Sequence, residues 1–316
     1  MLQQTRIEAV LPYYERFLHY LPDVPSLAQV QEDELLKLWE GLGYYSRARN
    51  LQKAANMLVN EHNGALPADY HQLLALPGIG EYTAGAIASI CFSIPVPAVD
   101  GNVMRVLARL TGDDTDVLST GAKKHFTAIA EQMLPKDQPG RFNQALMELG
   151  ETVCLPNTQP DCCRCPLQEI CVAFAGDLTR DLPVRSKKKP RRIERRMVDV
   201  IIIDGTPRRV LLRKRPTNGL LAGLWELPNA LSGENTLPDT LERLCSTENP
   251  TLLTGKHVFS HVEWHMQGRL RSMSVAKLPD GYRAATLDEV RSTYALPSAF
   301  RAFAAVLPQY LCEEAI

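Results

Sequence analysis

The chain has 316 residues, of which 45% are hydrophobic and 22% are charged, and its formal net charge is −1. This length suggests two domains, each large enough to bury its own core. The near-neutral charge excludes a globally basic protein, so any surface that binds nucleic acid has to be local. No apolar run approaches the roughly 18–20 residues that span a bilayer, and the N-terminus lacks a secretory pattern. We therefore expect a cytoplasmic protein without a membrane partner.

The first half of the chain carries a helical pattern of apolar residues. Ile7, Val10 and Leu11 begin one stripe, and similar spacing continues to Val153. A period of three to four residues is typical of helices that pack one face on a core. No strand-like run appears in this half. The sequence therefore predicts an all-α first domain over residues 1–176.

A proline- and glycine-rich turn, LPGIGEYTAGAI, interrupts this pattern at residues 76–87. Pro77 ends one helix, and Gly78 and Gly80 flank a single Ile before the next helix begins. Glycines at such a turn let backbone N–H groups approach an anion at a helix N-terminus. A plain helix–helix turn can also use proline and glycine. The pattern nevertheless favours a helix-hairpin-helix, which holds a DNA phosphate without reading the base sequence.

Asp100 stands eighteen residues after Tyr82, directly before Gly101 and Asn102. A carboxylate in this position can simply cap the N-terminus of the following helix. At this distance from a helix-hairpin-helix, however, the arrangement resembles the helix-hairpin-helix glycosylase superfamily, which has a Gly/Pro-rich loop and a catalytic aspartate. The resemblance implies that Asp100 is catalytic.

Five of the eight cysteines fall within eighteen residues. In a reducing compartment, such clustering indicates a metal site more often than a disulfide framework. The spacing is Cys154-x7-Cys162-x2-Cys165-x5-Cys171, with Cys163 as a spare thiol. Four thiolates in a short, loop-rich segment suit a [4Fe–4S] cluster. Zinc is the competing hypothesis, since four cysteines satisfy its tetrahedral preference equally well.

A basic segment and a change of period follow the cysteines. Residues 177–195 include PVRSKKKPRRIER, which cannot bury an apolar face, so we expect an exposed linker. The alternative is a linker that also follows DNA phosphates. Beyond it, β-branched runs such as MVDVIIIDG are separated by turn residues, and a helical stretch closes the chain near residues 298–311. The sequence predicts an α+β second domain over residues 196–316.

Five blocks together resemble the MutY family of adenine DNA glycosylases: MLQQTRIEAVLPYYERF, LWEGLGYYSRARNL, LPGIGEYTAGAI, VDGNVMRVLAR and RFNQALMELG. The resemblance covers essentially the whole chain. The family pattern is Cys-x6-Cys-x2-Cys-x5-Cys, so this chain has one extra residue in the first loop, and Cys162 keeps the later spacings intact. Endonuclease III, a relative in fold, has a nucleophilic lysine where this chain has Tyr82. Without that amine no Schiff base can form, so a glycosylase without efficient lyase activity is implied.

The resemblance also implies a substrate. The partner is double-stranded DNA with an 8-oxoguanine:adenine or guanine:adenine mispair, from which adenine is flipped out and cleaved at its N-glycosidic bond. Asp100 would stabilise or attack the oxocarbenium-like sugar, as carboxylates do in glycosidases, and Tyr82 would support that carboxylate. A monomer associated with the nucleoid is expected. Besides the hairpin glycines, the residues expected to contact DNA or the lesion are Tyr44 in the base stack, Gln144 at the flipped adenine, Gln4 beside 8-oxoguanine, and the neighbouring Gln3 and Thr5.

The second domain resembles a Nudix-like domain that inspects 8-oxoguanine. GLLAGLWELPN, residues 219–229, looks like a Nudix strand and turn. The residues that follow lack the Arg-Glu and Glu-Glu pairs of a metal-binding Nudix helix, so we expect no nucleotide hydrolysis. HVFSHVEW supplies Phe259, Ser260 and His261, which match the family's lesion-recognition loop. The predicted fold is thus multidomain: an all-α helix-hairpin-helix glycosylase domain with an iron–sulfur cluster loop, followed by an α+β Nudix-like domain.

The family's general acid is a Glu that would lie two residues before Met1, and the chain begins at that Met. The sequence is therefore expected to lack the donor that protonates adenine N7, through an internal start codon chosen in error or a real truncation. Losing a general acid typically costs about 10²–10⁴-fold in rate. Three alternatives to adenine excision remain: a noncatalytic lesion-binding protein, a bifunctional endonuclease III-like lyase and a Nudix hydrolase.

Overall fold

The computed structural model describes residues 1–2, 5, 7–156, 158–186, 190–246, 253–274 and 277–312 of the chain. Contacts divide the chain into two compact units, one made of Met1–Gln52 with Pro190–Ile316 and the other of Lys53–Lys189. The first unit therefore contains both ends of the sequence. The predicted domains, residues 1–176 and 196–316, are instead each continuous in sequence, and their boundaries stay a prediction. Among the helices of the described residues, none combines the length and the apolar character that a membrane crossing needs.

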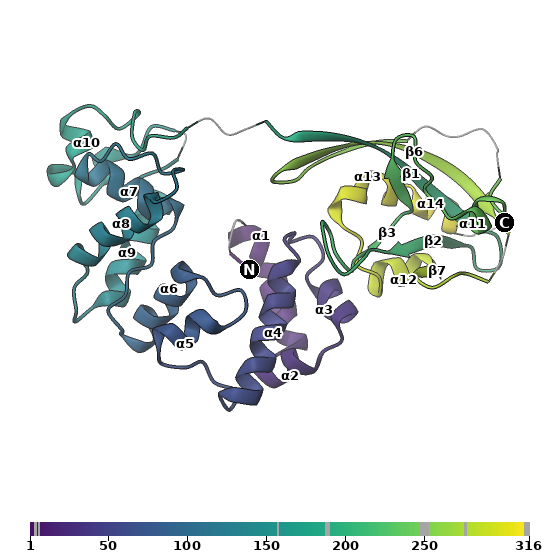
Figure 1. Ribbon diagram of the computed structural model, residues 1–316, viewed down its shortest axis with the longest axis horizontal. Coiled ribbons are helices and arrows are strands. Elements are labelled where there is room, and N and C mark those ends of the chain that lie inside the picture. Colours follow the sequence, from purple (N-terminus) through teal and green to yellow (C-terminus); the bar gives the residue numbers. More distant parts are fainter. Residues whose placement is uncertain are drawn as a thin grey trace. The chain divides into compact units, whose positions relative to one another are not determined.

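The unit of residues 53–189 is built from helices, as the sequence predicts (Figure 1). Its most buried helix is α7, in which every residue from Arg105 to Leu110 is buried. Helix α6 lies close to the loop before α7 because Gly85 has no side chain, and a Cβ there would lie 2.4 Å from the carbonyl oxygen of Pro97. The helices are α5 (Tyr70–Ala75), α6 (Glu81–Phe92), α7 (Gly101–Thr111), α8 (Ala122–Met133), α9 (Pro139–Thr152) and α10 (Val172–Ala175), with the end of α4 (Ser46–Glu61) and the 3₁₀ turns η1 (Cys162–Arg164) and η2 (Gln168–Ile170).

The N-terminal part of the other unit is also helical. It comprises α1 (Ile7–Tyr20), α2 (Val24–Gln29), α3 (Glu32–Leu38) and the start of α4. Between α3 and α4 the chain turns through Gly41, Gly43 and Tyr44, whose φ angles are 98°, 69° and 47°. Because a side chain disfavours this left-handed region, a tyrosine there has to be held by contacts with its surroundings.

The C-terminal part of the same unit is a mixed sheet, which confirms the predicted α+β class. The described residues form seven strands in the order β3-β2-β1-β6-β5, with β4 on β1 and β7 on β2. The long strands β1 and β6 are parallel, in a register that runs from Arg192 opposite Val262 to Ile203 opposite Met273. The strands are β1 (Arg192–Ile203), β2 (Arg209–Lys214), β3 (Trp225–Glu226), β4 (Asn229–Leu231), β5 (Leu253–Val258), β6 (Val262–Met273) and β7 (Tyr282–Ala285).

Short helices cover this sheet: α12, η3, α13 and α14 pack on the face of Val198, Val200 and Ile202, and α11 packs on the face of Ile201 and Ile203. Phe303 packs onto two glycines of the sheet, and a Cβ at Gly268 would lie 2.4 Å from its ring. The closing helical stretch expected near residues 298–311 is broken into short pieces. The helices of this part are α11 (Asp239–Glu242), α12 (Leu287–Ser292), η3 (Ser298–Phe300), α13 (Arg301–Ala304) and α14 (Leu307–Leu311).

The basic segment expected to be an exposed linker ends earlier than the sequence predicts. Strand β1 begins at Arg192 rather than after Arg195, because its backbone pairs with β6 from that residue on. The side chains of Arg192 and Arg195 remain exposed. The charged side chains of this segment therefore predicted its exposure correctly. They did not predict that its backbone pairs with β6.

Candidate functional site

The helix-hairpin-helix turn lies between α5 and α6. Gly78 has a φ of 81°, which only glycine adopts without strain. Gly80 is the N-cap of α6 with an extended φ of −93°, so it needs no glycine for conformational reasons. A Cβ on Gly80 would meet nothing within 4 Å. The absence of a side chain there leaves the start of α6 open to the close approach of a ligand, as a phosphate-binding hairpin requires.

Asp100 caps the N-terminus of α7. Its Oδ1 accepts hydrogen bonds from the backbone N–H groups of Asn102 at 2.9 Å and Val103 at 2.8 Å. The capping alternative is therefore correct as a description of the structure. It does not exclude a catalytic role, because both bonds end on Oδ1 and the half-buried carboxylate retains Oδ2 for another contact.

Tyr82 lies in the first turn of α6, near Asp100. Burial and then the charge of Asp100 raise the pKa of the Tyr82 phenol above its ordinary value. The phenol donates a hydrogen bond to Sδ of Met147 at 3.4 Å. Gln144 stands three residues before Met147 on α9 and is exposed. Residues three apart share a helix face, so Tyr82, Asp100 and Gln144 lie on one side of the helical unit.

Next to these residues the surface of the helical unit is hollowed. Tyr82 and Val99 line an open groove that continues along α8 past Lys123 and Lys124. The groove therefore begins beside the capping carboxylate and has basic side chains along part of its length.

Asn143 holds the loop that leads to Asp100, and the sequence analysis missed it. Its side chain is 1% exposed. Its Oδ1 accepts from the N–H of Ala98 at 3.0 Å, and its Nδ2 donates to the carbonyl of Val96 at 2.9 Å and to Oγ of Ser89 at 2.8 Å. Asn143 stands directly before Gln144 in the block FNQAL, so the sequence contained it but gave no sign of its burial.

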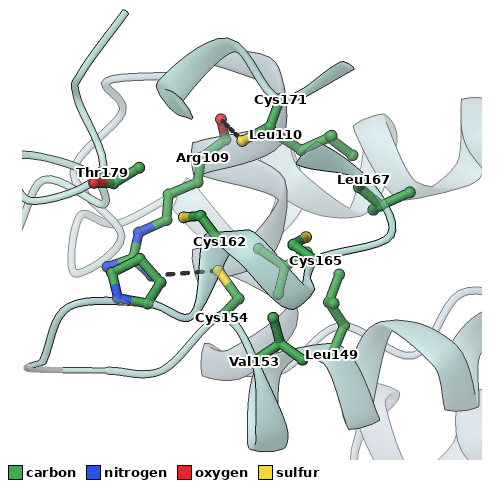
Figure 2. A pocket seen from close by; sticks show the side chains of 12 residues that line it. Arg109, Leu110, Leu149, Val153, Cys154, Cys162, Cys165, Leu167, Cys171 and Thr179 are labelled. Atoms are coloured by element: carbon green, nitrogen blue, oxygen red, sulfur yellow. Dashed lines mark hydrogen bonds between the residues drawn. The ribbon is translucent and has the colours of Figure 1, made fainter. Parts of the chain in front are cut away.

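The four predicted cluster ligands line one pocket between α7 and the loop that follows α9 (Figure 2). These ligands are Cys154, Cys162, Cys165 and Cys171. The spare thiol Cys163 is exposed and is not among the residues that line the pocket. Burial and then the charges of the other three cysteines raise the pKa of Cys162. Four thiols gathered in one pocket form a donor set that a cationic metal centre would stabilise.

Arg105 and Arg109, both on α7, join the helix of Asp100 to the cysteine loop. Arg105 donates to the carbonyls of Gly150 at 2.6 Å and Cys154 at 2.8 Å, and to Oδ1 of Asn102 at 3.0 Å. Arg109 donates to Sγ of Cys154 at 3.3 Å. Both side chains are buried. Nothing in the sequence indicated these two contacts, because a charged residue in a helix usually faces solvent.

The predicted lesion residues lie in the other unit. The hydroxyl of Tyr44 is 3.2 Å from Oγ of Ser260, although 216 positions separate the two residues. Phe259 packs its ring on Trp264 with the centroids 4.9 Å apart, while Ser260 and His261 are exposed at the turn between β5 and β6. Phe259 thus anchors a tip that presents two polar side chains.

Contacts from the start of β1 hold this tip. Arg191 Nε donates to the carbonyl of Phe259 at 3.0 Å, and the N–H of Arg192 donates to the carbonyl of His261 at 3.3 Å. Thr5 is half-buried, and its N–H donates to the carbonyl of Leu2 at 3.2 Å. Gln3 and Gln4 lie outside the described residues.

Comparison with known proteins agrees with both parts of the predicted fold. Residues 1–135 match the model of the HhH-GPD superfamily of base excision DNA repair proteins, and residues 199–305 match that of the NUDIX domain. An adenine DNA glycosylase of Mus musculus is 35% identical over 92% of this chain and 66% of its own length. That of Schizosaccharomyces pombe is 32% identical over 83% of this chain and 68% of its own length.

A solved structure of a thermostable thymine-DNA glycosylase is similar to the helical part, with a TM-score of 0.50 and 26% identity over 55% of this chain and 80% of that one. The chain spans between 42% and 68% of the length of the first five curated relatives.

Proposed function

Because the chain belongs to the adenine DNA glycosylase family, we propose that it excises adenine mispaired with 8-oxoguanine or guanine in double-stranded DNA. The proposed reaction is hydrolysis of the N-glycosidic bond after the adenine nucleotide has been flipped out of the duplex. Flipping costs a few kcal/mol, which contacts in an active-site pocket offset.

The observation that carries this proposal is the pairing of Asp100 with Tyr82. Two backbone hydrogen bonds fix the carboxylate at the N-terminus of α7, near Tyr82 in the first turn of the helix that follows the helix-hairpin-helix turn. A fixed carboxylate can stabilise an oxocarbenium-like sugar or form a bond to it, because it needs no reorganisation when positive charge develops.

Tyr82 supplies a protonated phenol beside this carboxylate. Its raised pKa keeps the hydroxyl neutral at physiological pH, so it can donate a hydrogen bond but cannot attack the sugar as an amine would. This chemistry favours water as the final nucleophile and argues against a Schiff-base lyase. Gln144, on the same side of the helical unit, would face the flipped adenine through its amide.

We propose that the four pocket cysteines hold a [4Fe–4S] cluster. Four thiols that line one pocket, in a short loop-rich segment, suit such a cluster. A structural zinc is the alternative, since four cysteines satisfy its tetrahedral preference equally well. The cluster would supply structural order to the loop after α9, which Arg105 and Arg109 attach to the helix of Asp100.

The proposed lesion contacts come from Tyr44 and the tip of the β5–β6 hairpin. Tyr44 would enter the base stack, and Phe259, Ser260 and His261 would inspect 8-oxoguanine. The contact between Tyr44 and Ser260 supports this assignment, since it brings the two proposed lesion elements within hydrogen-bond distance.

Single-turnover release of adenine from an 8-oxoguanine:adenine duplex tests the proposed reaction, with binding of the same duplex measured in parallel. Release at a substantial rate would support excision and would show that some residue of this chain supplies the proton to adenine. Tight binding without release would favour a noncatalytic lesion-binding protein. Trapping of a covalent adduct by borohydride would contradict the assigned role of Tyr82.

Iron and sulfide analysis of purified protein tests the cluster, and two neighbouring cysteines provide a matched pair. Cys162→Ser is expected to lose bound iron, because Cys162 lines the pocket, whereas Cys163→Ser is expected to retain it, because Cys163 is exposed. Loss of iron in both variants, or in Cys163→Ser alone, would contradict the ligand assignment. Bound zinc without sulfide would contradict the cluster itself.

A further inference from the structure

In the unit of residues 1–52 and 190–316, helix α3 docks on the C-terminal part through a pair of opposite charges. Lys37 Nζ donates to the carbonyls of Val290 at 2.9 Å and Tyr294 at 3.1 Å. Glu40 Oε1 accepts from the N–H of Leu296 at 2.6 Å. The two side chains also bond to each other, with Lys37 Nζ 2.6 Å from Glu40 Oε2. One charge pair thus binds an acceptor of α12, at Val290, and both an acceptor and a donor of the loop that follows this helix.

Arg49, on α4, makes a second contact of this kind. Its Nη2 donates to the carbonyl of Ala222, and its Nε bonds to Oε1 of Glu32 at 2.6 Å. Gly223 leaves the space for this guanidinium, because a Cβ there would lie 2.7 Å from Arg49 Nη2. The loop of residues 216–223 is therefore shaped to receive Arg49.

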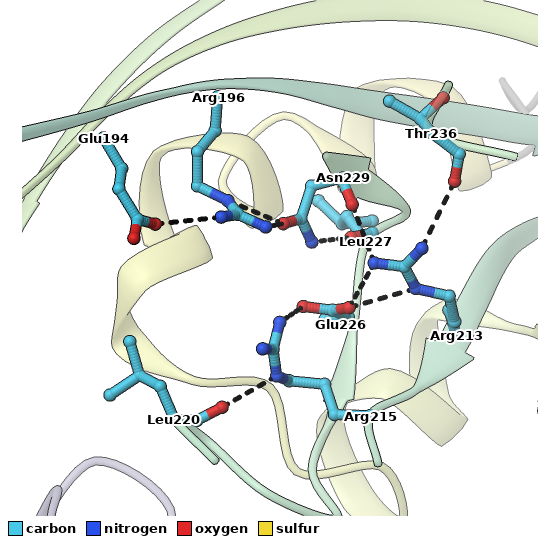
Figure 3. A network of polar contacts seen from close by, with 9 residues as sticks. All are labelled: Glu194, Arg196, Arg213, Arg215, Leu220, Glu226, Leu227, Asn229 and Thr236. Atoms are coloured by element: carbon cyan, nitrogen blue, oxygen red, sulfur yellow. Dashed lines mark hydrogen bonds and ion pairs between the residues drawn. The ribbon is translucent and has the colours of Figure 1, made fainter. Parts of the chain in front are cut away.

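The same loop is also held by a network of polar contacts around a buried carboxylate (Figure 3). Arg215 Nε donates to the carbonyl of Leu220 at 2.9 Å, and its Nη1 bonds to Oε2 of Glu226 at 2.6 Å. Arg213 bonds to Oε1 of the same carboxylate at 2.6 Å. Glu226 is 1% exposed. Because this network fixes the loop to the sheet, Arg49 binds a rigid partner and fixes α4 to the sheet as well.

Tyr44 lies between these two contacts in the chain. Lys37 and Glu40 precede it, and Arg49 follows it after one turn of α4. The segment that carries Tyr44 is therefore attached to the C-terminal part on both sides, and between the attachments the Tyr44 hydroxyl reaches Ser260.

We propose that Lys37, Glu40 and Arg49 are positioning residues that hold the Phe259–His261 tip against Tyr44 and thereby set the preference for 8-oxoguanine over guanine. The inference rests on the proposed lesion recognition and adds the contacts that make it precise. None of the three side chains needs to touch DNA in this role. Their partners in the C-terminal part are backbone groups: Lys37 and Arg49 bind carbonyls, and Glu40 binds an N–H. Since a carbonyl accepts only from a donor and an N–H donates only to an acceptor, the docking requires a cation at positions 37 and 49 and an anion at position 40.

This dependence gives a test that separates docking from helix stability. The double substitution Lys37→Glu/Glu40→Lys keeps an ion pair three residues apart at the C-terminal end of α3 and leaves the net charge of the chain unchanged. It also points a carboxylate at two carbonyls and an ammonium at an N–H. The swapped pair should therefore lose the contacts of positions 37 and 40 with the C-terminal part, while the ion pair of Asp33 with Lys214 and the contact of Arg49 with Ala222 remain.

The experiment measures dissociation constants for duplexes with 8-oxoguanine or guanine opposite a nonhydrolysable adenine analogue. The ratio is the dissociation constant for the guanine duplex divided by that for the 8-oxoguanine duplex. We expect this ratio to fall about tenfold in the swapped variant, which corresponds to the loss of one charge-assisted hydrogen bond. The helix content, measured by circular dichroism, should stay unchanged. Glu34→Gln, at an exposed carboxylate of the same helix, should leave the ratio unchanged.

Ser260→Ala adds a readout that general destabilisation would not alter. In the unsubstituted chain it should lower the ratio, and in the swapped background it should have no further effect, because the tip is already displaced. A swapped variant that keeps its ratio, or additive effects of the two changes, would overturn the positioning role. Equal binding of both duplexes by the unsubstituted chain would instead overturn the proposed lesion recognition, and the positioning role with it.

Discussion

In the helical unit, Arg105 binds backbone carbonyls 45 and 49 positions away in the chain, whereas in the other unit Lys37 binds carbonyls 253 and 257 positions away. Both side chains use charge to hold a loop by its backbone. The proposed catalytic residues are thus organised within the continuous stretch Lys53–Lys189. The proposed lesion residues Tyr44 and Phe259–His261 are organised by contacts between the two ends of the sequence.

This difference determines how each half should respond to substitution. A contact within one stretch stabilises the unit that contains the reacting residues, so its loss is expected to appear in stability or in the rate of excision. A contact between chain ends sets the position of one surface relative to another, so its loss is expected to appear in the choice of substrate. The predictions below test that separation.

The largest effect is expected from Asp100→Asn. An amide caps a helix as well as a carboxylate does, so α7 should persist while the negative charge is lost. The single-turnover rate of adenine release should fall about 10²–10⁴-fold relative to the unsubstituted chain, with duplex binding retained. Asp69→Asn is the matched control, since Asp69 caps α5 in the same way by accepting from Gln72 N at 2.8 Å. A comparable loss of rate in the control would mean that the negative charge at any helix cap of this unit matters, and that the charge of Asp100 has no special role at the reacting sugar.

Arg105→Met should lower the free energy of unfolding of the helical unit by about 3–5 kcal/mol. The substitution leaves the carbonyls of Gly150 and Cys154 and the amide oxygen of Asn102 without their donor, and buried groups without a partner are costly. Chemical denaturation measures the change. Arg164→Met removes an arginine whose side chain is 77% exposed and lies 3.5 Å from Asp161, so it should cost less than about 1 kcal/mol. Similar values for the two variants would refute the structural role of the buried guanidinium.

The sequence predicted well those features that lie within a few residues of one another. The Gly78 of the predicted hairpin turn does adopt a left-handed conformation. The spacing that favoured Cys162 over Cys163 as a ligand agrees with the structure, in which Cys162 lines the pocket and Cys163 is exposed. Both features depend on local backbone geometry, which residue type and spacing encode directly. Asp100 was recognised both as a cap and as a candidate catalytic residue, and one carboxylate can serve in both roles because it has two oxygens.

The sequence failed where a polar residue is buried or binds a distant loop. Asn143 and Lys37 have residue types that usually face solvent, and nothing beside them in the chain reveals that they satisfy backbone groups elsewhere. Such contacts depend on how the chain folds back on itself, which periodicity does not contain. The same reason explains why β1 was expected to begin after Arg195, since its first residues are charged and only pairing with β6 makes them a strand.

Tyr45 should make the stability of its unit depend on alkaline pH. Burial raises the pKa of its phenol from 10.0 to about 12. The unfolded chain therefore releases this proton first, so the stabilisation is fully present below about pH 10 and is lost as the pH rises toward 12. Two units of pKa correspond to about 3 kcal/mol. Denaturation at several pH values should show this loss in the unsubstituted chain and a smaller one in Tyr45→Phe. Tyr14→Phe, at a tyrosine that is 52% exposed, should keep the full dependence, and a full dependence in Tyr45→Phe would refute the assignment.

The smallest effect is expected from Thr286→Ala. Thr286 caps the N-terminus of α12, the helix in which the carbonyl of Val290 accepts a hydrogen bond from Lys37. Thr286 Oγ1 accepts from the N–H of Glu289 at 3.2 Å, and Glu289 Oε2 accepts from the N–H of Thr286 at 2.8 Å. Losing the cap should cost about 1 kcal/mol of stability, and Thr286→Ser should restore most of it. The ratio of affinities for 8-oxoguanine and guanine duplexes should stay unchanged, because a local cap stabilises α12 without setting where the C-terminal part docks. A lowered ratio would mean that local and long-range contacts jointly position the lesion tip, and the separation between the two kinds of contact would fail in this unit.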